Sequence, residues 1–413
     1  MHSERIDSWP LPVFRTTLPN GFTVITMADD SGLVDMKLCI AAGAEHEKTP
    51  GTAHLLEHCI STGETVIYPE RLSALLELNA KFNATTSWRS TMYDLSNLFP
   101  DEMLEALKQL MTLVYDDPFS HKKIAREKKA VIQEISDHTS AQSIARQQFE
   151  TTQVLHVSTR TQHSTVMGTA ATVESIDAAT LELFRTTWYT AKNSALIVVG
   201  TVQHEHVVEL AHAATRQLEA GDRVRLFSFD TFTPGRFTFT HPQNTPQLNI
   251  VTTLPSGHMV HRGVAEALCA PDGILTHVLR IEHGINYGVS IGFDPFPSDY
   301  AYIDIRSKQS NLERVETTAR EILRRPEIYR ATAERTLAHF KAGYAKNLLA
   351  KKQTDRFARV HLKAIYRTWI RDSWKTIDVS TELKELTIDA LFTEMHRHLN
   401  PDNLAWIQIR SSD

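Results

Sequence analysis

Residues 51–59 read Gly-Thr-Ala-His-Leu-Leu-Glu-His-Cys, and both the expected fold and the expected chemistry follow from this run. If the run is helical, His54 and His58 lie four residues apart on one face. Two imidazoles at that spacing can bind one Zn²⁺, and Glu57 lies close enough to polarise a metal-bound water. The residues alone leave a second interpretation open, an amphipathic helix with two partly exposed histidines. A catalytic zinc site also needs a third protein ligand.

A second helix can supply that ligand. Residues 122–135 read as a helix, with an apolar side formed by Ile124, Val131 and Ile135. Glu127 and Glu134 are seven residues apart, nearly two full turns, so they share a face beside the apolar stripe. A carboxylate at the edge of a buried stripe needs a partner, and zinc would be one. Because Lys and Arg crowd the same helix, a solvated face stays open as the alternative.

The segment from His54 to Glu134 resembles the pitrilysin/insulinase (M16) family of zinc metallopeptidases, especially its short-chain group. The order H-x-x-E-H is that of the inverzincins. In the family a ligand Glu follows some 75 residues later inside E-x6-E; here Glu134 follows His58 by 76 residues and Glu127 is the first Glu. The resemblance implies His54, His58 and Glu134 as Zn²⁺ ligands and Glu57 as general base. Glu127 would orient a ligand without contacting the metal.

Two further segments match the family. Residues 82–87 resemble an edge strand that pairs with the substrate backbone, which implies Asn83 and Ala84 as substrate-binding residues. The segment around Arg280 and Tyr287 resembles one whose Arg and Tyr hold the substrate carbonyl, where donors stabilise the oxyanion. From the residues alone, an ordinary core strand would be favoured for residues 82–87, and a surface Arg and a core Tyr would be the plain interpretation of Arg280 and Tyr287.

The chain reads as a duplication. Residues 175–200 contain a helix followed by an Asn-led apolar strand, and residues 387–409 repeat this order. A second internal similarity relates residues 92–95 to residues 302–305, because each reads as a strand followed by a helix. We therefore expect two homologous domains.

The expected fold class is α+β, with two α/β-sandwich domains at residues 1–220 and 230–413. Asn-Gly within residues 18–22 favours a hairpin turn, and residues 34–42 read as the next strand. Such an order favours a mixed or antiparallel sheet with helices on one face. The resemblance to the M16 family implies the same fold, with the chain as half of a clamshell.

Composition excludes several classes of function. The chain of 413 residues is 42% hydrophobic and 23% charged with a net charge of −5, as in an ordinary globular protein. Basic residues are scattered along the chain, which argues against nucleic-acid binding. No apolar run approaches the length of a membrane-spanning helix. The N-terminus has no apolar signal core, and the three cysteines are far apart and odd in number. These features fit a reducing compartment, so we expect a cytoplasmic protein. Cys59 is expected to be a buried small hydrophobe.

The resemblance predicts a zinc-dependent endopeptidase that hydrolyses peptides or short unfolded polypeptides inside a closed chamber. Because the chain has both the zinc motif and the Arg/Tyr pair, a homodimer is expected, with a heterodimer containing a related subunit as the alternative. A peptidase dedicated to one precursor or leader peptide and a non-catalytic partner subunit remain open as alternative functions.

Overall fold

The computed structural model forms two compact units. The first unit contains the described residues within 1–139, 164–227 and 350–376. The second unit contains the described residues within 140–163, 228–349 and 377–413. The continuous domains expected at residues 1–220 and 230–413 stay a prediction. The structure describes residues 3–7, 9, 11–61, 80–116, 119–138, 140–154, 165–223, 232–255, 258–294, 300–352, 362–370 and 379–412.

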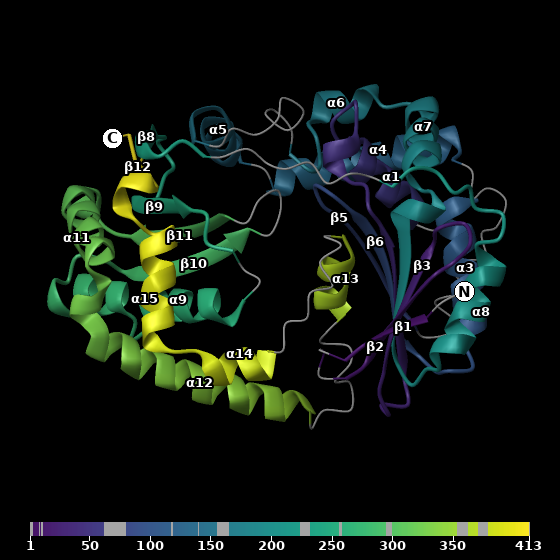
Figure 1. The fold of residues 1–413 in the computed structure, drawn as a ribbon. Helices are drawn as coiled ribbons and strands as arrows, with labels where there is room; N and C mark the ends of the chain where they lie inside the picture. Colours follow the sequence, from purple (N-terminus) through teal and green to yellow (C-terminus); the bar gives the residue numbers. More distant parts are fainter. Residues whose placement is uncertain are drawn as a thin grey trace. The chain divides into compact units, whose positions relative to one another are not determined.

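The first unit contains a seven-stranded mixed sheet in the order β1-β2-β3-β7-β4-β6-β5 (Figure 1). Strands β3 and β7 are parallel, and the other neighbouring pairs are antiparallel. The expected hairpin turn joins β2 to β3, with Gly21 at a φ of 95° and the Leu18 amide donating to the Phe22 carbonyl. The strands are β1 (Ser3–Ile6), β2 (Val13–Thr17), β3 (Thr23–Ala28), β4 (Val34–Ile40), β5 (Lys81–Thr86), β6 (Thr91–Leu98) and β7 (Ser194–Gly200).

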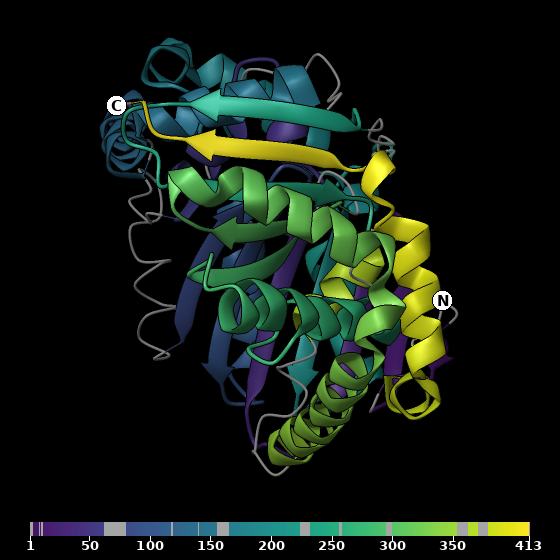
Figure 2. The same cartoon turned by 90° about the vertical axis from the view of Figure 1, so that its left-hand side faces the viewer.

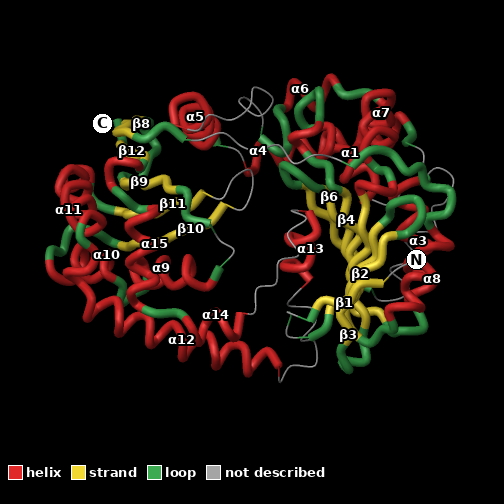
Figure 3. The backbone as a smooth tube through the Cα atoms, in the orientation of Figure 1, coloured by secondary structure: helices red, strands yellow, loops and turns green. Residues whose placement is uncertain are grey.

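Helices cover this sheet and enclose the main core (Figure 3). Leu38 and Leu196 of the sheet are fully buried in the same cluster as Leu55 and Leu110 of the helices. Helix α13 comes from far along the chain and contacts β7. The helices are α1 (Thr52–Ser61), α3 (Met103–Tyr115), α4 (His121–His138), α6 (Ala170–Ser175), α7 (Ala178–Trp188), α8 (His204–Ala214) and α13 (Leu362–Ile370), with 3-10 turns at Ala44–His46 and Ala191–Asn193.

The second unit repeats the strand order of the first. Its five-stranded sheet runs β10-β11-β9-β12-β8, as β5-β6-β4-β7-β3 does in the first unit, and its one parallel pair, β12 with β8, takes the place of β7 with β3. The duplication and the mixed α+β fold predicted from sequence are therefore confirmed. The strands are β8 (Gly235–Thr240), β9 (Gln247–Thr252), β10 (Gly288–Asp294), β11 (Tyr300–Arg306) and β12 (Ala405–Arg410).

Helices also pack on the second sheet (Figure 2). Leu248 and Ile303 of the sheet are buried with Leu268 and Met395 of helices α9 and α15. The helices are α5 (Ala141–Phe149), α9 (Met259–Cys269), α10 (Ile274–Thr276), α11 (Leu312–Arg324), α12 (Arg330–Lys352), α14 (Val379–Glu385) and α15 (Ile388–His398), with π-helical segments at Glu150–Val154 and His277–Glu282 and 3-10 turns at Gln309–Asn311, Pro326–Tyr329 and Pro401–Asn403.

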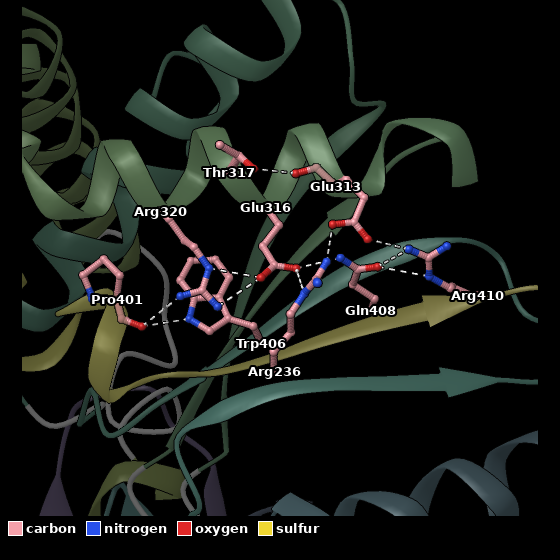
Figure 4. A network of polar contacts seen from close by, with 9 residues as sticks. All are labelled: Arg236, Glu313, Glu316, Thr317, Arg320, Pro401, Trp406, Gln408 and Arg410. Carbon is pink, nitrogen blue, oxygen red and sulfur yellow. Dashed lines mark hydrogen bonds and ion pairs between the residues drawn. The ribbon is translucent and has the colours of Figure 1, made fainter.

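A polar network holds α11 on this sheet (Figure 4). Glu316 of α11 is buried and accepts hydrogen bonds from Arg236 at 3.0 Å, from Arg320 at 3.0 Å and from Gln408 at 2.6 Å. The Arg320 guanidinium also lies 4.1 Å above the Trp406 ring, a cation–π contact. A buried carboxylate with this many donors has its charge compensated, so the network joins α11 to β8 and β12.

The three cysteines form no disulfide with one another. Cys39, Cys59 and Cys269 are all free, and Cys59 is a fully buried member of the first core as expected. Burial raises the pKa of its thiol to about 12, which keeps it protonated. Within the described part of the chain, no helix combines the length and the apolarity needed to cross a membrane.

Candidate metal centre

The H-x-x-E-H run is helical, as predicted, and its start is held by a turn that sequence reasoning did not single out. Gly51, at a φ of 93°, precedes α1, and an added Cβ there would lie 2.6 Å from the Met167 carbonyl oxygen. The Glu47 carboxylate accepts from the amides of Gly51 at 2.7 Å and Ala53 at 2.9 Å. These amides belong to the N-terminal turn of α1, which has no partners of its own in the helix. The turn therefore sets the position of α1 in the unit.

His54, His58 and Glu134 meet where α1 packs against α4. Glu134 Oε2 lies 3.1 Å from His58 Nε2 and 3.7 Å from His54 Nε2, and one ligand atom from each of the three residues lies within 4.8 Å of the others. Nitrogen and oxygen ligands at ~2.0–2.1 Å around one tetrahedral zinc are about 3.3 Å apart. The three side chains thus need little adjustment to share one ion.

Glu127 lies on the other side of the His58 ring. Its carboxylate oxygen Oε2 is 3.7 Å from His58 Nδ1, while the other oxygen accepts from Arg126 Nε at 2.8 Å. Glu127 is buried, whereas Glu134 is partly exposed. His58 therefore has one nitrogen facing each carboxylate, the arrangement in which an outer carboxylate fixes the orientation of a metal-binding imidazole.

Glu57 is buried beside this group. Its carboxylate accepts from the hydroxyl of Thr86 on β5 at 3.3 Å and from the Ser61 hydroxyl at 3.4 Å. Burial raises the pKa of Glu57, and the nearby His58 and the two hydroxyls oppose this rise. A raised pKa brings a carboxylate closer to the range in which a general base works near neutral pH.

These groups line one cleft of ≈ 350 Å³ in the first unit. Strand β5 forms one wall and is the edge strand of its sheet, as predicted for residues 82–87, because it pairs with β6 alone among the described strands. Ala84 lines the cleft, whereas Asn83 is exposed and is not among the lining residues. The lining residues are His54, Glu57, His58, Ala84, Thr85, Thr86, Glu134, Val166 and Met167.

The chemistry of the donors fits zinc. Two imidazoles and one carboxylate are the three-ligand set of many catalytic zinc sites, which leave a position for water. Burial, and then the neighbouring His58, lowers the pKa of His54 to about 4, so this imidazole is neutral at physiological pH, the form that binds metal. His54 Nδ1 is buried and has no hydrogen-bond partner within the described residues. The two imidazoles and the carboxylate therefore form a donor set that suits Zn²⁺.

Arg280 and Tyr287 belong to the second unit, and both are exposed. Arg280 lies in the π-helical segment after α10, and Tyr287 precedes β10, an edge strand of the second sheet. Tyr287 is 61% exposed, so the alternative interpretation of a core tyrosine is wrong.

Sequence reasoning did not identify Glu47, Thr86 or Met167 as parts of the site. Glu47 and Met167 lie outside the matched motifs, so only their contacts with α1 and the cleft reveal them. Thr86 lies inside the predicted edge strand, but its partner Glu57 is 29 residues away in the sequence.

Comparison with known proteins assigns the family. Residues 23–166 match the model of the insulinase family, peptidase family M16, and residues 175–334 match that of the M16 inactive domain. The chain belongs to peptidase family M16. The first match contains the H-x-x-E-H run and Glu134, and the second begins just before α7.

This M16 protein is distantly related to mitochondrial-processing peptidase subunits beta. It is 29% identical over 229 residues to the subunit from Caenorhabditis elegans, over 53% of this chain and 48% of the relative. It is 31% identical over 202 residues to a probable subunit from Arabidopsis thaliana, over 47% of this chain and 37% of the relative. The match thus spans about half the length of the first relative and less of the second.

Solved structures share the whole fold of this M16 chain. A protease from Helicobacter pylori superposes with a TM-score of 0.79 over 97% of this chain and 100% of its own, at 14% identity. The first half of the periplasmic protease PqqL from Escherichia coli superposes with a TM-score of 0.74 over 96% of this chain and 92% of its own, at 17% identity. At these identities the likeness concerns the fold alone.

Proposed function

We propose that this M16 protein is a zinc-dependent endopeptidase that hydrolyses peptides or short unfolded polypeptides. The observation that carries the proposal is the group His54, His58 and Glu134, which lines one cleft together with Glu57. Membership of peptidase family M16 supports the same activity.

In this proposal His54, His58 and Glu134 bind Zn²⁺, which when present acts as a Lewis acid toward the peptide carbonyl and the attacking water. Glu57 takes the proton of that water and passes it to the leaving amine. The hydroxyls of Thr86 and Ser61 favour the ionised form of Glu57 that this step requires.

Two carboxylates near the histidines have different roles in the proposal. Glu134 is partly exposed on the cleft side and ligates directly. Glu127 is buried behind His58 and orients its ring through the Nδ1 side.

We further propose that an extended substrate adds as a strand to the edge of β5. The backbone polar groups of an edge strand can pair with a further strand, which supports Asn83 and Ala84 as contact positions. Arg280 and Tyr287 are proposed to donate to the substrate carbonyl, and their exposure leaves both side chains available.

The proposed assembly is a homodimer with a closed chamber, because one chain carries both the H-x-x-E-H motif and the Arg280/Tyr287 pair. The relatives are named as subunits, which supports a heterodimer with a related chain as the alternative. Three free cysteines support a reducing compartment such as the cytoplasm.

A second candidate function is the processing of one precursor or leader peptide. The relatives named as processing peptidases favour it. A peptide library containing both leader-like and unrelated sequences separates the two functions, because a dedicated processing enzyme cleaves few members at few sites.

The test of the main proposal is cleavage of that library, followed by mass spectrometry, with the wild type, Glu57→Gln and a matched control. Loss of a general base lowers kcat/KM by ~10²–10⁴-fold. We expect this loss in Glu57→Gln with the zinc content unchanged, and none in Glu205→Gln, an exposed residue of α8 in the same unit.

Two outcomes would contradict the proposal. Full activity of Glu57→Gln would remove Glu57 from the role of base. Bound zinc without cleavage of any peptide would instead identify a non-catalytic partner subunit.

A further inference from the structure

A second group of metal-binding side chains lies in the second unit, apart from the residues of the proposed peptidase site. His261 is on α9, and Glu394 and His398 are on α15, which packs against α9 (Figures 1 and 2). Glu394 Oε2 lies 3.1 Å from His261 Nε2 and 3.1 Å from His398 Nε2. One ligand atom from each residue lies within 4.8 Å of the others, so the three converge on one point.

All three side chains are largely buried. The exposed fractions are 9% for His261, 17% for Glu394 and 13% for His398. The other oxygen of Glu394 is 3.7 Å from the exposed Arg397, so Oε2 is the atom directed at the histidines.

One nitrogen of His261 takes no part in the convergence. His261 Nδ1 is buried without a hydrogen-bond partner among the described residues, whereas Nε2 is the nitrogen that faces Glu394. The observation that carries the site is therefore the approach of two Nε2 atoms, one from each histidine, to the same oxygen of Glu394.

The group has the same composition as the first one. Each has two imidazoles and one carboxylate, with two of the three donors four residues apart on one helix and the third on a neighbouring helix. Helix α9 follows β9 as α1 follows β4 at the matching place in the first sheet, and His54 and His261 are each the third residue of their helix. The donor pair of the second group is Glu394 and His398 rather than two histidines.

We propose that His261, Glu394 and His398 bind a Zn²⁺ ion. Imidazole nitrogen with carboxylate oxygen is a zinc-type donor set, and the Nε2–Oε2 separations are close to the ~3.3 Å between ligands of one tetrahedral zinc. The ion ties the N-terminal part of α9 to the end of α15. This site is separate from the proposed peptidase site and does not depend on it.

The test uses the full chain with the first group disabled by His54→Ala and His58→Ala. After treatment with a chelator, this variant is titrated with ZnCl₂ alone, and bound zinc is measured by calorimetry and by elemental analysis. We expect one equivalent of zinc. Adding Glu394→Gln or His398→Ala is expected to weaken binding by at least about 100-fold, because loss of a residue that only orients a ligand already costs ~10–100-fold.

The matched control is His396→Ala, two residues before His398 on the same helix. His396 is half exposed and pairs with Glu327 at 3.3 Å, so its loss should leave zinc binding unchanged. Titration with Co²⁺ gives a second readout, because its visible absorption reports a tetrahedral nitrogen and oxygen environment. That absorption should disappear in Glu394→Gln and persist in His396→Ala.

Two results would overturn the proposal. One is a folded His54→Ala/His58→Ala variant, judged by circular dichroism, that takes up no zinc. The other is bound zinc that survives both Glu394→Gln and His398→Ala, which places the metal elsewhere. If His398→Ala fails to fold, Glu394→Gln decides alone, because it preserves side-chain volume.

Discussion

Thr86 on the edge strand is expected to set the pH at which Glu57 becomes active. Its hydroxyl donates to the buried Glu57 carboxylate at 3.3 Å and so favours the ionised form against the effect of burial. Thr86→Val keeps the shape of the side chain and removes this donor. The pKa of Glu57 should therefore rise.

The size of the shift follows from the geometry. A hydrogen bond to a charged group contributes ~1.5–3 kcal/mol, and 3.3 Å is long for a hydroxyl donor. We take the low end, about 1.5 kcal/mol, which corresponds to about one pH unit. A general base must be ionised to accept a proton, so the acidic limb of the kcat/KM profile should move up by about one pH unit. Activity below the limb should fall about tenfold, while the plateau stays near that of the wild type.

The assay is kcat/KM for one cleaved peptide over the pH range in which the fold is intact. The control is Thr85→Val, the neighbouring hydroxyl on the same strand, whose side chain points to the opposite face of the strand from Thr86. It should leave the position of the limb unchanged. A lowered plateau with an unmoved limb in Thr86→Val, or an equal shift in Thr85→Val, would refute the reasoning.

Three further predictions concern metal affinity and stability. Gly51 has a φ of 93°, and an added Cβ would lie 2.6 Å from a backbone oxygen, so Gly51→Ala should lower the free energy of unfolding by roughly 2–4 kcal/mol. Gly32 has a φ of 74° but open space around it, so the control Gly32→Ala should lower that free energy by only about 1–2 kcal/mol. Chemical denaturation measures both. Glu127→Gln should weaken zinc binding ~10–100-fold in competition with a chelator, and unchanged affinity would exclude its role in orienting a ligand. Glu316→Ala removes the hydrogen-bond partner of the buried Gln408 amide and of two partly exposed arginines, and it should cost ~1–3 kcal/mol. Glu313→Ala at an exposed position should cost less than about 1 kcal/mol, and equal losses in urea unfolding would contradict this.

Local sequence patterns were sufficient to predict the helices that carry the candidate ligands His54, His58 and Glu134. The run around His54 is the helix α1, residues 122–135 lie inside α4, and Asn-Gly makes the hairpin turn between β2 and β3. Each depends on contacts within a few residues, such as helical periodicity and turn chemistry, which are written in the order of the residues. The similarity between residues 175–200 and 387–409 likewise predicted two similar domains, and the structure shows that their sheets share a strand order.

Contacts between distant segments could not be predicted in the same way. The Met167 carbonyl lies against Gly51 at the start of α1, and nothing in the sequence around Met167 marks it. Thr86 reaches Glu57 because the edge strand packs on α1. Such contacts arise when elements pack, and packing depends on the whole core rather than on a local period.

The two candidate metal-binding groups differ in how far the sequence alone could predict them. The sequence by itself determined the family, the duplicated α+β fold and the three residues His54, His58 and Glu134, because a short motif and a fixed spacing mark them. Only the tertiary structure placed His261 beside Glu394 and His398, since 133 residues separate the first two and no motif joins them. Ligands on one helix are paired by its turn, but ligands on two helices are paired only by the packing of those helices.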